Sequence, residues 1–355
     1  MGCCSPKKLN ILNQEENKNE FIYEKVNIDN IDNNGNNSNN SVESNIKENS
    51  SNNNININQD DNKLKEKPKS YNSYISSNKT IQTTKVLDTD YETFKNTLPP
   101  LNTEDDDKIE IKKNLILDDN IIYYGEYNTE KKIREGRGIQ IWPNGSKYLG
   151  YFQNNKQNIQ GKMIHVDGDI YEGEWVDGKA NGKGKFIHNG VTIEGNWKND
   201  KMEGFCVETW NDGSRFEGYY IDGKKEGKGK YVWSDGSSYE GDFKDNAFNG
   251  KGKFIWDNER MYEGNWENSK MNGNGIFTWP DGRKYEGEYN NDKKEGYGIF
   301  YWPDGRIYKG FWKNNLQNGE GEIYDPKKNK TKKGIWENGK KIILKLLNYY
   351  IIKKN

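Results

Sequence analysis

Residues Tyr262–Gly287 read YEGNWENSKMNGNGIFTWPDGRKYEG, and the parts of this stretch recur on both sides of it at a nearly constant spacing. Gly264, which closes the opening Tyr-Glu-Gly, has counterparts every 22 or 23 residues along the chain. These counterparts are Gly173, Gly195, Gly218, Gly241, Gly287 and Gly310. A second glycine, which opens a Gly-x-Gly pair at Gly273, recurs on the same period. Self-similarity at a fixed period of about 20 to 50 residues is the signature of a repeat array, and this array decides the fold.

Each unit predicts a β-hairpin. In the unit that begins at Tyr239, residues 239–243 and 250–256 alternate apolar or small residues with charged ones, which is the period of a half-exposed strand. A polar loop is predicted between them, from Lys244 to Asn249. The residues of the second strand that the spacing places on one face are Gly250, Gly252, Phe254 and Trp256.

The stretch Trp279-Pro280-Asp281-Gly282 predicts the turn to the next unit, because Pro fixes φ and Gly accepts a left-handed conformation. Hairpins joined in this way give an all-β fold, an elongated single-layer antiparallel meander of about nine hairpin repeats of about 23 residues. At ~4.8 Å per strand, its eighteen or so strands would extend roughly 85 Å before twist shortens them.

The two faces of this sheet differ in chemistry. One face carries Tyr, Gly, Phe and Trp, while the other carries Glu240 and Asp242 opposite Lys251 and Lys253. Opposite charges on neighbouring strands keep that face soluble and add a few tenths of a kcal/mol per pair. Glycine on the aromatic side would leave room for a neighbouring ring to lie flat.

The pattern of Tyr-Glu-Gly, Gly-x-Gly and Pro-Asp-Gly closely resembles the MORN repeat family over roughly Tyr123–Gly339. The resemblance implies an elongated, twisted single-layer β-meander with an aromatic groove. It also implies a scaffold or targeting module at membranes, cilia or the cytoskeleton, and some family members have been linked to phospholipids. Four departures predict less regular units: Met163 stands where we expect the second glycine, Cys206 replaces another, Asn189 stands near a Trp position, and Glu259 replaces a turn glycine.

Composition divides the chain. All eleven Trp lie between Trp142 and Trp336, whereas Asn-rich tracts dominate the first hundred residues. We therefore predict a disordered low-complexity tether over residues 9–108, the array over 109–340, and a basic-apolar cap over 341–355 that covers the last hairpin or folds into the groove. An alternative role for that tail is contact with anionic lipid. The net charge of −1 predicts no nucleic-acid partner.

The chain begins Met1-Gly2-Cys3-Cys4, which resembles a dual acylation signal. Gly2 would carry myristate and the thiols of Cys3 and Cys4 palmitate, because one myristoyl chain alone binds membranes only marginally. Pro6 departs from the usual pattern, which has Ser or Thr at that position. We predict residues 1–8 to be the membrane anchor. The expected location is the cytoplasmic face of a membrane, at the plasma membrane or cell cortex, with a cilium as a further option.

No catalytic constellation stands out. His165 and His188 occupy positions that are otherwise aromatic or apolar, and Cys206 has no acid–base partner that the period would place beside it. Phosphate-loop, dinucleotide and metal-ligand spacings are absent from the sequence. The prediction is a non-enzyme without a cofactor or metal.

A single-layer sheet has no second layer to cover its aromatic face, so we expect that face to bind an extended segment or amphipathic helix of a partner protein. The residues expected to line this groove are Trp233, Tyr239, Trp256, Tyr262, Trp266, Trp279, Tyr285, Trp302 and Trp312. The alternative function is direct binding of anionic phospholipid by the array or the basic tail. Self-association into a homodimer is a third hypothesis.

Overall fold

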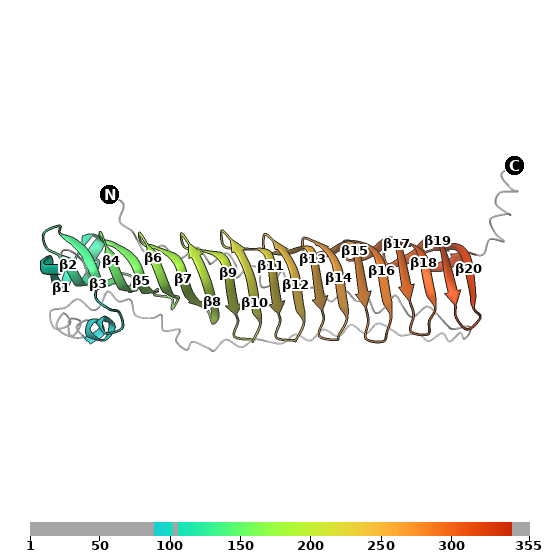
Figure 1. Ribbon diagram of the computed structural model, residues 1–355, viewed down its shortest axis with the longest axis horizontal. Helices are drawn as coiled ribbons and strands as arrows, with labels where there is room; N and C mark the ends of the chain where they lie inside the picture. The colour runs from blue at the N-terminus through green and yellow to red at the C-terminus, as the bar shows by residue number, and fades with distance from the viewer. Residues whose placement is uncertain (1–88, 102–105, 343–355) are drawn as a thin grey trace, which may run out of the picture.

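The computed structural model describes residues 89–101 and 106–342 of the 355-residue chain. The sheet that it contains has 21 strands, and each strand pairs antiparallel with the next strand of the chain. Figure 1 shows the result as an elongated array with hairpin connections along both long edges. The predicted all-β meander is confirmed. The acylation start and the tail from residue 343 onward lie outside the described residues.

The array begins with a short 3-10 helix, η4 (Asp106–Lys108), and a second one, η5 (Asp118–Asn120), separates the first two strands; residues 89–95 are α-helical. The strands are β1 (Ile109–Ile116), β2 (Ile122–Asn128), β3 (Ile133–Ile141), β4 (Lys147–Gln153), β5 (Lys156–Ile164), β6 (Ile170–Val176), β7 (Lys179–His188), β8 (Val191–Lys198), β9 (Lys201–Thr209), β10 (Arg215–Ile221), β11 (Lys224–Val232), β12 (Ser238–Lys244), β13 (Ala247–Ile255), β14 (Met261–Glu267), β15 (Lys270–Thr278), β16 (Lys284–Asn290), β17 (Lys293–Tyr301), β18 (Ile307–Lys313), β19 (Leu316–Asp325), β20 (Lys330–Glu337) and β21 (Lys340–Ile342).

The turn inside each repeat is shorter than the sequence predicts. In the unit of β12 and β13, the predicted loop from Lys244 to Asn249 is wrong, because only Asp245 and Asn246 lie between the strands. Their φ angles are 48° and 69°, which is the type I′ geometry that Asn and Asp tolerate and that matches the twist of a hairpin. Most of the polar residues assigned to a loop therefore belong to β13.

The turn between repeats agrees with its prediction. Trp279 donates its backbone N–H to the carbonyl of Arg283 at 3.0 Å, and Gly282 donates to the carbonyl of Trp279 at 3.0 Å. Gly282 has a φ of 89°, the left-handed conformation expected from the Pro-Asp-Gly sequence.

The first glycine of each Gly-x-Gly pair lies in a β-bulge. Gly250 has a φ of 72°, opposite a register shift between Gly241 and Phe243. The prediction that Gly250 shares the inward face with Gly252 is therefore wrong. Phe248, which the sequence placed in a loop, takes the buried position instead.

The second glycine belongs to a row that crosses the sheet. Gly241 pairs with Gly252, Gly252 with Gly264, and Gly264 with Gly275. A Cβ added at Gly252 would lie 2.5 Å from Cζ of Tyr239, so the ring occupies the space that a side chain would need. This confirms that glycine makes room for the neighbouring ring.

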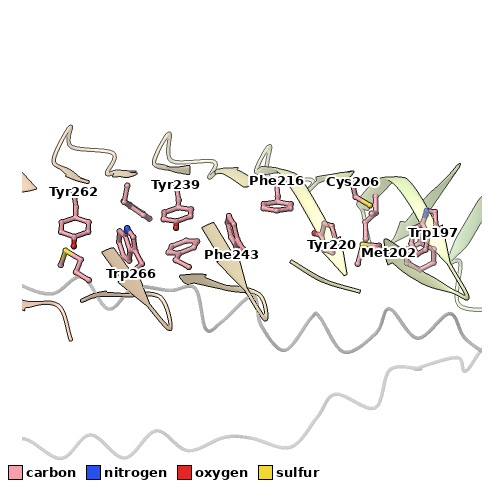
Figure 2. Packing of buried hydrophobic residues seen from close by; sticks show 14 of the residues in the cluster. Trp197, Met202, Cys206, Phe216, Tyr220, Tyr239, Phe243, Tyr262 and Trp266 are labelled. Carbon is pink, nitrogen blue, oxygen red and sulfur yellow. The ribbon is translucent and has the colours of Figure 1, made fainter. Parts of the chain in front are cut away.

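The rings over the glycine row form one continuous core, which we call the aromatic face. Tyr239 donates its hydroxyl to the carbonyl of Asp242 at 2.9 Å and meets Phe243 edge-on at 5.2 Å between centroids. Figure 2 shows rings of this cluster following one another along the array. We call the opposite, charged surface the polar face.

The units of Met163 and Cys206 both keep the glycine row, but the pairing of β4 with β5 is less regular, because its register shifts directly between Gly150 and Tyr151 and Ile159 stands in the bulge with a φ of 62°. Gly161 pairs with Gly150 and Gly173, so the row continues there, and Met163 fills a ring position instead of replacing a glycine. Cys206 does stand in the row, paired with Gly195 and Gly218. The expectation of less regular pairing at this unit is not met.

Candidate functional site

Most of the nine aromatic residues predicted to bind a partner lie inside the core. Those that are no more than 7% exposed are Tyr239, Tyr262, Trp266, Trp279, Tyr285 and Trp312. Trp266 donates its Nε1–H to the carbonyl of Gly252 at 3.0 Å and meets Tyr262 edge-on at 5.0 Å. These rings join neighbouring hairpins, and their binding of a partner stays a prediction.

The other three, Trp233, Trp256 and Trp302, are half-buried at the edge of the core, each just before a turn between repeats. The guanidinium carbon of Arg260 lies 5.7 Å from the ring centroid of Trp256, and that of Arg306 lies 5.2 Å from Trp302. Of the predicted set, these three rings are the most accessible to a partner.

The aromatic face also holds two buried lysines that the sequence reading missed. Lys225 and Lys294 follow a two-residue turn, at the repeat position that Phe248 fills elsewhere, and that periodic equivalence is the signal that could have found them. Lys225 forms an ion pair with Glu208 at 2.9 Å. The ammonium of Lys294 lies 5.0 to 5.3 Å from the ring centroids of Trp279, Tyr285, Phe300 and Trp312.

An open groove of about 1460 Å³ crosses the polar face from β9 to β17 along the glycine row. We call it the polar-face groove. Charged side chains and glycine backbone line most of it, as at Glu240, Gly241 and Lys251. Sequence periodicity identifies these residues as a solvated surface but does not reveal that the twisted sheet hollows it.

Charge is unevenly distributed along the polar-face groove. Glu217 of β10 and Glu240 of β12 line the half that begins at β9. The lysines that line the groove all come from β11 and β13: Lys228, Lys230, Lys251 and Lys253. The charged residues that line it from β14 to β17 are all acidic: Glu263, Glu286 and Glu288. The groove therefore has a lysine-rich half and an acidic half.

Exposed aromatic pairs stand at both ends of the groove. Phe205 and Tyr219 face each other across β9 and β10, with ring centroids 5.6 Å apart, and are 45% and 52% exposed. Tyr297 and Phe311 occupy the same repeat position across β17 and β18, 5.7 Å apart, and are 47% and 48% exposed. The hairpins between them have polar pairs at this position, such as Lys228 and Asp242.

A segment of the chain already occupies the polar face at the N-terminal end. Tyr91 and Phe94, on the helical residues 89–95, are buried against Tyr124, Ile139 and Ile141 of β2 and β3. The sequence assigned residues 89–101 to the disordered tether, but their aromatic and apolar side chains find a matching patch on the sheet. Figure 1 shows this short coil beside the first strands.

Polar contacts fix the same segment. The guanidinium of Arg137 donates to the backbone carbonyls of Lys95 and Leu98 at 3.4 and 3.3 Å, and the hydroxyl of Tyr151 donates to that of Pro99. Glu126 holds Arg137 in place through an ion pair of 2.6 Å. Arg137 and Tyr151 face each other across β3 and β4, at the repeat position of the two exposed aromatic pairs.

The described residues offer little for catalysis. They contain no cluster of His, Cys, Asp and Glu suited to a metal ion, and no helix among them is long and apolar enough to span a membrane. Cys206 is buried, and burial raises the pKa of its thiol to about 11, which disfavours the reactive thiolate. His188 bonds Asp169 through Nδ1 at 2.5 Å.

The fold and this surface define an open repeat scaffold built from β-hairpins. The MORN repeat family matches residues 130–147, 171–190, 194–215, 216–238, 239–259, 262–282, 285–305 and 308–330. The chain therefore carries MORN repeats across residues 130–330. The stretch 148–170 between the first two matches contains Ile159, which stands in the bulge with a φ of 62°.

Structural likeness to solved proteins is weak. The TCP domain of SAS-4 (dCPAP) from Drosophila melanogaster, in complex with a proline-rich motif of dSTIL, is 14% identical over 53% of this chain and 94% of that one, with a TM-score of 0.28. A mutant of the TCP10 domain of Danio rerio CPAP is 14% identical over 56% of this chain and 99% of that one, with a TM-score of 0.22. TM-scores this low carry no functional argument. No curated protein matches the sequence closely enough to count as a relative.

Proposed function

We propose that the chain is a membrane-tethered scaffold that binds a partner protein along the polar-face groove. The observation that carries this proposal is the presence of an exposed aromatic pair at each end of the groove. The sheet does not need these rings, because polar pairs occupy the same position in the hairpins between them. Exposed aromatic side chains in a groove are typical anchors for a protein partner.

The support for the membrane tether comes from the sequence alone. Myristate on Gly2 with palmitate on Cys3 and Cys4 would supply the two signals that stable anchoring needs. The scaffold would then stand at the cytoplasmic face of a membrane, at the plasma membrane or cell cortex.

Phospholipid binding has less support from the groove, because Glu263, Glu286 and Glu288 would repel anionic head groups along half of its length. The basic tail from residue 343 lies outside the described residues and keeps that alternative open. Mixing the full-length Gly2→Ala protein with phosphatidylserine vesicles distinguishes phospholipid binding from binding of a partner protein. Salt-sensitive binding to these vesicles would favour lipid as the ligand.

Proximity labelling in cells tests the partner. Wild-type chain is compared with a variant that carries Phe205→Ser, Tyr219→Ser, Tyr297→Ser and Phe311→Ser, and the variant is expected to lose specific protein neighbours while it stays in the membrane fraction. The control is Ile116→Ser with Ile221→Ser, since both residues are exposed but lie outside the groove. An unchanged set of neighbours in the groove variant would refute the proposal.

Fractionation tests the tether separately. Gly2→Ala is expected to move the chain from the membrane pellet to the soluble fraction, because palmitoylation depends on the first acyl chain bringing the thiols to the membrane. A pellet fraction equal to that of the wild type would exclude the acyl anchor.

A further inference from the structure

We infer that the partner binds the polar-face groove as one extended segment, with an aromatic or aliphatic anchor at each end, an acidic first half and a basic second half. "First" denotes the half nearer Phe205 and Tyr219. This inference rests on the proposed function and specifies the chemistry of the partner.

The spacing of the aromatic pairs sets the length of the segment. The pairs lie on β9–β10 and β17–β18, eight strands apart. At ~4.8 Å per strand this is about 38 Å along the sheet, which an extended chain of about twelve residues covers at ~3.3 Å per residue. A single linear segment can therefore reach both Phe205 and Tyr297.

The charge gradient sets the composition of the segment. Lys228 and Lys230 of β11 lie nearer Phe205, Lys251 and Lys253 of β13 lie at the middle of the groove, and Glu286 and Glu288 of β16 lie nearer Tyr297. A ligand with acidic residues over the lysines and basic residues over the glutamates gains complementarity in both halves and avoids like-charge contacts. An anionic membrane surface or a nucleic acid satisfies only the lysine-rich half.

The chain's own residues 89–101 show that this face holds a peptide, although residues 89–95 bind as a helix and not as an extended segment. Tyr91 and Phe94 supply apolar anchors, while Arg137 and Tyr151 bind carbonyls of the segment. The pair of Arg137 and Tyr151 is equivalent by register to the pair of Tyr297 and Phe311. Peptide binding at this repeat position is thus already present in the fold, and the two aromatic pairs are open positions of the same kind.

The tail of this chain is a poorer occupant. Residues 343–355 contain Lys345, Lys353 and Lys354 and no acidic residue, so they lack the half that would face the lysines. A separate partner fits the groove better.

Three synthetic peptides test the inference on the unacylated full chain by fluorescence anisotropy. The first has Tyr at both ends, with a block of five Glu and a block of five Lys between them, which gives the length of about twelve residues that the groove requires. The second has the same composition with Glu and Lys alternating, and the third keeps the blocks but replaces both Tyr with Ser. We expect the first to bind, the second to bind at least about fivefold more weakly, and the third at least about tenfold more weakly, because anchors carry most of the binding energy.

Variants of the chain locate the site. Phe205→Ser with Tyr219→Ser, and separately Tyr297→Ser with Phe311→Ser, should each weaken the block peptide about tenfold. Ile221→Ser is the matched control and should leave its affinity unchanged. The inference would be overturned if the first two peptides bound with equal affinity or if the block peptide did not bind. It would also be overturned if both aromatic double variants bound the block peptide as tightly as the wild type.

Two outcomes separate this inference from the proposed function. Suppose that the proteins labelled in cells depend on the four aromatic residues but the block peptide does not bind. The partner then docks by a folded surface, and only the inference of a linear segment is refuted. If the neighbours do not depend on the rings, the proposed function fails as well. Deletion of residues 343–355 should not change peptide affinity; a gain would show that the tail occupies the groove and would also overturn the inference.

Discussion

A tyrosine ring and two glycines form the smallest unit of this fold. The ring of Tyr239 lies over Gly241 and Gly252, and its hydroxyl donates to the backbone three residues ahead, at Asp242. Each part needs the others, because the ring requires bare backbone beneath it and the hydroxyl requires a carbonyl within reach once it is buried.

Gly252→Ala should destabilise the array by about 1 to 3 kcal/mol, the usual cost of overpacking. The added Cβ would overlap the Tyr239 ring, which other rings hold on several sides. Gly213→Ala is the control, because nothing lies within 4 Å of its added Cβ and only its φ of 87° is strained. Thermal melts followed by circular dichroism should show the larger loss for Gly252→Ala; the reverse order would refute the close-packing role of the row.

Cys206 replaces a row glycine together with a second change. Ile193 takes the position of the ring, and it is shorter than the tyrosine found in most units. The thiol of Cys206 fills the space and lies 3.6 Å from the carbonyl of Asn196, the same relative position that Tyr239 reaches at Asp242. The two substitutions therefore compensate each other.

A double-mutant cycle tests this compensation. Ile193→Tyr alone should clash with the thiol, and Cys206→Gly alone should leave a cavity, so each should cost about 1 to 3 kcal/mol. The double variant restores the arrangement of Tyr239 and should recover most of that loss. If the changes in melting temperature caused by the two single substitutions simply add in the double variant, the two residues are independent.

At the scale of the hairpin, the two-residue turn decides which side chains enter the core. Because β13 begins at Ala247, Phe248 faces the aromatic side, and Lys225 does the same in the preceding unit. Lys225 is tolerated there because Glu208, which is 2% exposed, stands at the ring position of the strand two before it and pairs with it. A buried pair of this kind is costly to break but not to replace as a whole.

Lys225→Phe should therefore cost about 3 to 5 kcal/mol, because it leaves the Glu208 carboxylate buried without a counter-ion and with only the hydroxyl of Tyr220 donating to it. Lys225→Phe with Glu208→Tyr recreates the residues that Phe248 and Tyr231 supply one repeat later, and it should recover most of that loss, although the Tyr220 hydroxyl loses the carboxylate that accepts from it. Chemical denaturation midpoints compare the three proteins. A double variant as unstable as the single one would mean that the ion pair contributes more than its burial costs.

At the scale of the whole molecule, the described strands form one sheet with a continuous aromatic core, and residues 89–101 pack on its polar face at the N-terminal end. Each strand pairs with its neighbours in the chain, so stability is a sum of unit and neighbour terms, as in other repeat proteins. Tyrosines supply much of that core, and burial raises the pKa of Tyr239, Tyr262 and Tyr285 above the ordinary value of 10.0.

Stability should consequently fall at alkaline pH. Burial raises the pKa of these tyrosines in the folded protein, so tyrosines in the unfolded chain ionise first. The contribution of the buried tyrosines to stability is therefore complete below pH 10.0 and is lost as the pH rises further. Melting temperatures between pH 8 and 12 should drop, and tyrosinate absorbance should appear together with unfolding. Tyr262→Phe should reduce the dependence of the melting temperature on pH. A melting temperature that does not change at alkaline pH would contradict the burial of these rings.

The periodic sequence alone determined the hairpin repeat, the antiparallel meander, the Pro-Asp-Gly turns and the chemical difference between the faces, because each follows from local spacing and backbone preference. Tertiary structure decided which rings are accessible. Tyr239, Tyr262 and Tyr285 pack so closely on their neighbours that they are fully buried, whereas Trp233, Trp256 and Trp302 at the edge of the same face stay half-buried. The groove arises on the polar face, where side chains from nine successive strands converge, and no local pattern encodes that convergence. Residues 89–101 find their place by contact with Tyr124, Ile139 and Arg137, which composition cannot show. Spacing fixes the units, but the twist and packing of the assembled sheet fix the surface that a partner meets.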